Sequence, residues 1–340
     1  MLYLESRQCA LAAQIRPRFH CSLGEMTKVP EDPSRARRKW MPICGLLLLC
    51  LIWALGWVRA DLSPGRGTGI RLNPLWSEAV LLGSFAVISG VAGAASKRRW
   101  PIRTEIGKAV VIGVGLFVVP AVLNTFIKER IEDTTRVALF SLTPLFAVIF
   151  ERHLRTDEEQ AETRGGFLAS MAAVAGTFLV FPVELPQSYG SALAMLAVIV
   201  AAAAVALANC VGVETVQRRG VCSLTLAAIS AGSAAMLLGI AGLIALRIGT
   251  STVALDAWAV SDVLALANLF WLMRQMSATQ MTTRFLIAPL IANLISLALL
   301  RPHVQVLAWI GLLLIAAGSG WMLCAPKERG DTPITIGVGE

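Results

Sequence analysis

Long apolar runs separated by short polar connections fill most of this chain, and they restrict its fold more than any other feature. A helix that crosses the hydrocarbon core of a bilayer needs about 20 mostly apolar residues. We identify ten such runs: 41–58, 76–96, 107–127, 134–150, 165–183, 189–212, 222–246, 257–274, 279–300 and 304–324. The connections leave little room for a soluble domain. The sequence therefore predicts an all-α integral membrane protein with ten transmembrane helices.

The composition excludes several other classes of protein. Only 15% of the residues are charged and the mean hydropathy is +0.68, whereas about a quarter of a soluble domain is charged. The net charge of +8 does not indicate nucleic-acid binding, because the basic residues lie between apolar runs, where membrane topology decides their placement. The sequence has no HExxH or GxSxG motif and no metal-ligand spacing of its cysteines. We therefore expect no enzyme activity, catalytic residue, metal or cofactor.

The distribution of lysine and arginine predicts the orientation. With the N-terminus in the cytoplasm, 22 of the 30 basic residues fall on the cytoplasmic side, as the positive-inside rule requires. We expect a multi-pass protein of a bacterial-type inner membrane with both termini cytoplasmic. Residues 1–40 are predicted to be a disordered basic tail and 326–340 a second cytoplasmic tail. Alternatively, Arg35–Ala60 is a signal peptide, since basic residues precede an apolar run.

A repeated pattern divides the chain into two halves. Asn124-x-Phe126-x3-Arg130 closes the third apolar run and Asn268-x-Phe270-x3-Arg274 closes the eighth. A proline follows within the next run of each half, and a glycine comes 22 residues later, at Gly166 and Gly311. The repeats are predicted to cover 41–183 and 189–325. A unit of five helices must place its second copy upside down, which gives the five-plus-five inverted-topology repeat typical of secondary transporters.

Three stretches give the chain a resemblance to the drug/metabolite transporter superfamily, specifically its EamA-like family. They are Leu51–Gly56 in the first run, Ser141–Phe146 in the fourth and Trp309–Gly318 in the tenth. The resemblance covers about 41–325, and it implies a ten-helix transporter without indicating a substrate. In one departure, Glu151-Arg152 follows the fourth-run proline early. The absence of a mid-span lysine argues against the polyanionic substrates of some relatives.

Pro144 and Pro289 interrupt apolar segments at matching places in the two halves. Proline frees a backbone carbonyl that needs another partner, so such a pair predicts a substrate site at the membrane midplane, with Thr143 beside it. Alternatively, the prolines only kink packed helices.

Four asparagines in apolar runs are candidates for hydrogen bonds to a substrate: Asn124, Asn209, Asn268 and Asn293. An amide in hydrocarbon needs partners, and the alternative is that these side chains hold helices together. Asn124 and Asn268 are predicted to face one central cavity from opposite halves.

Trp53 and Trp271 are candidates to line that cavity, or else to pack against lipid and other helices. Asp262 is a candidate for proton coupling, because an ionisable group within a membrane is by default a functional hypothesis; alternatively it lies in the first turn of its helix. Arg284 and Arg136, near the starts of their runs, are expected to extend to the interface as long basic side chains do.

These features predict a secondary active transporter, an exporter by preference, of a small neutral or zwitterionic metabolite or amino acid. Its partners would be that solute and membrane lipid, and it would be a monomer or homodimer. The first alternative is a lipid-carrier flippase on the same fold. A lipid-modifying membrane enzyme is less favoured, since it should show acids, histidines or metal ligands clustered at one membrane face.

Overall fold

The computed structural model describes residues 33–62, 70–96, 101–154, 163–246, 253–255, 259–300 and 305–324. The secondary structure of these residues is almost entirely helical. The helices are α1 (Pro33–Leu62), α2 (Pro74–Ala95), α3 (Arg103–Gly113), the π-helical turn η1 (Val114–Val118), α4 (Val119–Ile127), α5 (Asp133–Phe140), α6 (Thr143–Leu154), α7 (Thr163–Val180), α8 (Tyr189–Gln217), α9 (Ser223–Leu246), α10 (Ala259–Leu272), α11 (Ala278–Thr282), α12 (Arg284–Leu300) and α13 (Val306–Cys324). Two short strands, β1 (Ile70–Leu72) and β2 (Val253–Leu255), pair antiparallel.

Eight helical segments of the described chain are long and apolar enough to cross a membrane. Three of them combine shorter elements: α3 to α4, α5 with α6, and α11 with α12. The expected fifth and eighth spans are the shorter apolar helices α7 and α10. α7 ends at Val180 instead of 183, because the α conformation is disfavoured for the residue before Pro182.

The outward faces of these helices are apolar. Val87 on α2, Leu168 on α7, Met236 on α9 and Leu313 on α13 are each about 70% exposed. A soluble monomer rarely exposes large apolar side chains on so many of its helices, whereas lipid solvates them. Together with the long apolar helices, this arrangement makes the chain an all-α, multi-pass membrane protein.

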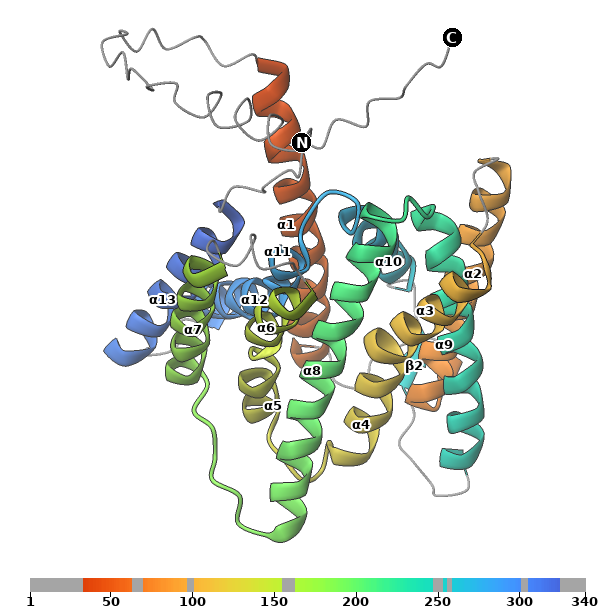
Figure 1. Cartoon of the computed structure of the whole chain (residues 1–340). Coiled ribbons are helices and arrows are strands. Elements are labelled where there is room, and N and C mark those ends of the chain that lie inside the picture. Colours follow the sequence, from red (N-terminus) through yellow and green to blue (C-terminus); the bar gives the residue numbers. More distant parts are fainter. Residues whose placement is uncertain are drawn as a thin grey trace, which may run out of the picture. The chain divides into compact units, whose positions relative to one another are not determined.

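α2 and α9 lie side by side and run antiparallel (Figure 1). Gly83 faces Ala235, Gly90 faces Ala228 and Gly93 faces Thr225. Residue numbers rise along α2 as they fall along α9, so the two helices are antiparallel. Small residues at an interface let helix backbones approach closely in a membrane. The small residues of α9 therefore form a packing face toward α2.

α7 and α13 make the second antiparallel pair (Figure 1). One close approach is between Gly176 and Gly311, where a Cβ on either residue would lie within 2.7 Å of the other's carbonyl oxygen. Farther along, Gly318 faces Ala173. The contact between Gly176 and Gly311 requires glycine at both positions, because there is no room for a side chain between the two backbones.

The two proline-containing spans are broken at different places. α6 begins at Thr143, so Pro144 lies in its first turn, where a missing N–H costs nothing. In the second half the chain breaks at Thr283, and Pro289 lies inside α12. The sequence therefore locates both interrupted spans, but the break of the second one comes six residues before its proline.

The predicted tails fall largely outside the described residues. Residues 1–32 and 325–340 are not among them, so the predictions for those segments stay untested. The N-terminal tail is shorter than expected, because α1 begins at Pro33 and includes the basic run Arg35–Lys39. Proline is well suited to the first helical position.

Candidate functional site

The most unusual polar group in the described bundle is the guanidinium of Arg284, the first residue of α12. Its side chain is among the largest fully buried ones, and the residue is 2% exposed. Its Nη1 donates hydrogen bonds to Asn209 Oδ1 on α8 (3.2 Å) and to the Met281 carbonyl of α11 (3.1 Å). Its Nε is buried without a partner. The cation is thus held by neutral groups only.

Aromatic rings surround this cation. The guanidinium carbon lies 5.7 Å from the ring centroid of Trp53 and 4.7 Å from that of Phe285. Phe285 also packs on Trp53 and on Phe140, with centroid separations of 6.5 and 6.1 Å. Aromatic faces attract cations but carry no net charge. We call Trp53, Phe140, Asn209, Arg284 and Phe285 the Arg284 cluster; its members come from α1, α5, α8 and α12.

Local sequence explains how α12 comes to begin at this point. Ser277 caps the five-residue helix α11 in a capping box with Gln280. Glu151, at the end of α6, accepts hydrogen bonds from the backbone N (3.1 Å) and hydroxyl (2.7 Å) of Thr279. The hydroxyl of Thr283 donates a hydrogen bond to the Gln280 carbonyl at 2.6 Å. The chain therefore turns at Thr283, and Arg284 starts a new helix inside the bundle.

The expectation that Arg284 extends to the membrane interface is wrong. α11 lies between this residue and the preceding connection, and Asn209 offers the guanidinium a partner inside the bundle. Arg136 is different: it is half-buried, pairs with Asp133 and hydrogen-bonds Asn124 Oδ1.

Of the residues predicted to bind substrate, Trp53 and Asn209 meet in the Arg284 cluster. The Nδ2 of Asn209 donates to the Val205 carbonyl at 2.6 Å, which leaves its Oδ1 to accept from Arg284. Sequence reasoning missed Phe140 and Phe285, since apolar aromatic residues are unremarkable in an apolar span.

The matched asparagines have unlike surroundings. Asn268 is half-buried and donates from Nδ2 to the Gly45 carbonyl of α1 at 2.7 Å, where Trp271 also packs over Gly45. Asn124 is exposed one turn before α4 ends, and its described partner is Arg136. These contacts are those of residues that hold helices together, and a substrate role for either asparagine or for Trp271 stays a prediction.

The remaining candidates lie on the broken spans or beside them. Thr143 is fully buried and donates to the Phe140 carbonyl at 2.6 Å; Pro144 and Pro289 are also buried. Asn293 has its Nδ2 buried without a partner. Asp262 lies in the first turn of α10, close enough to Glu78 for their charges to interact.

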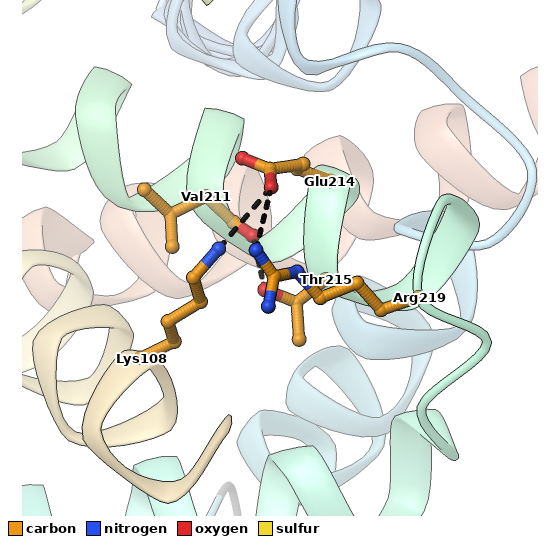
Figure 2. Close-up of polar contacts among 5 residues, drawn as sticks. All are labelled: Lys108, Val211, Glu214, Thr215 and Arg219. Atoms are coloured by element: carbon orange, nitrogen blue, oxygen red, sulfur yellow. Dashed lines mark hydrogen bonds and ion pairs between the residues drawn. The ribbon is translucent and has the colours of Figure 1, made fainter. Parts of the chain in front are cut away.

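A second polar group joins helices of the two halves (Figure 2). Lys108 on α3 forms an ion pair with Glu214 on α8 at 3.1 Å, and Arg219 approaches the same carboxylate at 3.6 Å. Beside them, the hydroxyl of Thr215 donates a hydrogen bond to the Val211 carbonyl at 2.7 Å. The predicted topology puts this group at the cytoplasmic end, together with the contact between Glu151 and Thr279.

The described part of the chain contains no group of three or more histidine, cysteine, aspartate or glutamate side chains that could hold a metal ion. What the Arg284 cluster offers chemically is a desolvated cation with unused N–H donors and a wall of aromatic rings.

Comparisons with known proteins add information on the fold alone. No family model matches the chain, and no curated protein matches it. Solved structures do match: one, described only as "Crystal structure of protein", superimposes with a TM-score of 0.61 at 15% sequence identity. The match covers 84% of this chain and 99% of the other. At that identity the two chains share a fold, and the likeness says nothing about activity.

Proposed function

We propose that this protein is a secondary active transporter that moves a small organic solute across the membrane by alternating access. We further propose that it has ten transmembrane helices in two inverted five-helix repeats, as in the EamA-like family, and lies in a bacterial-type inner membrane with both termini cytoplasmic. One observation carries the proposal: two of the five helix pairs that correspond between the predicted repeats, α2 with α9 and α7 with α13, pack against each other antiparallel.

The repeat interval supports this reading. Pro144 and Pro289 are 145 residues apart. Ala173 and Gly318, also 145 apart, face each other across α7 and α13, and Ala86 and Gly232, 146 apart, do so across α2 and α9. Equivalent residues of two repeats contact each other only near the two-fold axis that relates the repeats. Such an axis would pass through the middle of both helix pairs. Inverted repeats are related by a two-fold axis that lies in the membrane plane.

The Arg284 cluster fits a transport site in this scheme. Trp53 and Phe140 belong to the first predicted repeat, and Asn209, Arg284 and Phe285 to the second. Transporters of this kind bind substrate between their repeats, beside broken helices, and expose it to either side as the repeats rock. Here the breaks at 141–142 and at Thr283 lie next to members of the cluster.

The test is transport by the full-length protein in sealed proteoliposomes. A panel of radiolabelled metabolites is assayed for counterflow, with and without an imposed pH gradient, against protein-free vesicles. We expect saturable counterflow of at least one small solute. Counterflow of none of them, in vesicles that hold folded protein, would contradict the proposal.

Proton coupling is tested at Asp262 in the same vesicles. The variant Asp262→Asn should keep counterflow and lose acceleration by the pH gradient. Glu184→Gln is the matched control, because Glu184 is an exposed carboxylate on the connection between α7 and α8. Equal gradient responses in both variants would remove Asp262 from the coupling mechanism.

A further inference from the structure

The charge of Arg284 is uncompensated within the described bundle. A guanidinium stays protonated in proteins, and Arg284 forms no ion pair with any described residue, since its described partners are an amide, a backbone carbonyl and two aromatic rings. The Cys50 thiol, also buried, is within electrostatic reach of it. Burying an unpaired charge is costly. Such residues within membrane segments are rare and mark the paths of substrates or ions.

The donors that remain unused define the missing partner. Of the five N–H groups of Arg284, both described hydrogen bonds use Nη1. Nε is buried without a partner, and no described residue accepts a hydrogen bond from Nη2. Nε and Nη2 form one edge of the planar guanidinium, and a carboxylate can accept from both atoms of such an edge at once.

We infer that the transported solute of this protein carries a carboxylate that pairs with the Nε–Nη2 edge of Arg284. This inference rests on the proposed transport function and specifies the substrate class. The cluster offers a single cation, so a solute with one negative charge cancels it, whereas a phosphate dianion would bring an excess charge into the bundle. The rings of Trp53, Phe140 and Phe285 suit an apolar or aromatic body on the solute.

The inferred substrate, a monoanion, therefore differs from the neutral or zwitterionic solute expected from the sequence. Recognition of a zwitterion would need a second, acidic partner for its ammonium group. No acidic side chain is among the described contacts of the Arg284 cluster. A monocarboxylate needs no such partner.

The test measures binding in detergent, which does not depend on transport. Benzoate, indole-3-acetate and hexanoate are each compared with their own carboxamide by thermal stabilisation and calorimetry of the purified full-length protein; phenyl phosphate and phenylalanine are the further arms. We expect at least one carboxylate to bind, and its amide to bind roughly 10- to 100-fold more weakly, since hydrogen bonds to charged groups are the strong ones. Tighter binding of phenyl phosphate or of phenylalanine than of every monocarboxylate would overturn the inference, and so would carboxylates and amides that behave alike.

Three variants separate recognition from a structural role. Arg284→Gln should lose the preference for carboxylate over amide, and without ligand it should melt at or above the wild-type temperature, because a buried unpaired charge is removed. Arg284→Lys should keep a weakened preference. Arg136→Gln is the control, since Arg136 already pairs with Asp133. A lower melting temperature of ligand-free Arg284→Gln, with the carboxylate preference intact, would make Arg284 a structural residue. Carboxylate binding without any counterflow would instead refute the transport proposal and leave Arg284 as a carboxylate-binding site.

Discussion

Replacing Gly311 by alanine should force α7 away from α13, whereas the same replacement at Gly320 on the same helix should be harmless. A Cβ at Gly311 would lie 2.7 Å from the carbonyl oxygen of Gly176 and 2.7 Å from Cγ2 of Val180. A Cβ at Gly320 meets nothing within 4 Å. The obstruction at Gly311 includes backbone, which cannot rotate aside as the end of a flexible side chain can.

The expected cost follows from the size of the displacement. The backbones must separate by roughly 0.7 Å to reach ordinary contact, and a gap of that size forfeits about a quarter to a half of each van der Waals contact. If about 50 atom pairs along the interface gain ~0.15 kcal/mol each, the loss is about 2–4 kcal/mol, which overlaps the ~1–3 kcal/mol typical of overpacked cores. Alanine at Gly320 should change the stability by about 0 to +1 kcal/mol, through its better helix propensity alone.

The measurement is the melting temperature of the purified protein in detergent. It is taken as the temperature at which half of the protein no longer stays monodisperse after heating. At about 2–4 °C per kcal/mol, Gly311→Ala should melt roughly 4–16 °C below the wild type. Gly176→Ala should behave alike, and the double variant should cost less than the sum, because one separation of the helices relieves both clashes. Equal melting of Gly311→Ala and Gly320→Ala would refute the close backbone contact.

Three further predictions use the same protein. Glu214→Gln should lower stability by less than ~1 kcal/mol, because the ion-paired side chains are about a quarter exposed; a loss of several kcal/mol would contradict this. Asn268→Leu should cost ~0.6–2 kcal/mol by loss of an interhelical hydrogen bond and Asn124→Leu less, since Asn124 is exposed; the reverse order of melting temperatures would be evidence against these contacts. In a cysteine-free background, cysteines at Ser96 and Ser188 should react with an impermeant reagent from opposite sides of the membrane, and labelling from one side would disprove the predicted topology.

The helices were predictable because hydrophobic length is a local property. Each of the ten apolar runs contains helical structure, and the differences lie at the ends, where single residues decide. Pro182 stops α7 early, and Pro33 starts α1 within the expected tail.

The site was harder to predict, because its chemistry depends on which helices meet. The position of Arg284 near one end of an apolar run favours a side chain that reaches water. Only the tertiary structure shows that the Met281 carbonyl of α11 and the side chain of Asn209, 75 residues earlier, accept hydrogen bonds from it. Asn124 and Asn268 match in sequence and still differ in their contacts, since a repeat constrains the course of the backbone more tightly than the partner of each side chain.

The break in the second half also explains how the bundle tolerates the cation of Arg284. Where α11 ends, its last carbonyls lack helical donors, and the Met281 carbonyl accepts from Arg284. The Met281 carbonyl is an oriented dipole that lowers the cost of burying the guanidinium, but a dipole supplies no net charge. One positive charge therefore remains between the two halves of the protein, and this is the property that a monocarboxylate substrate would neutralise.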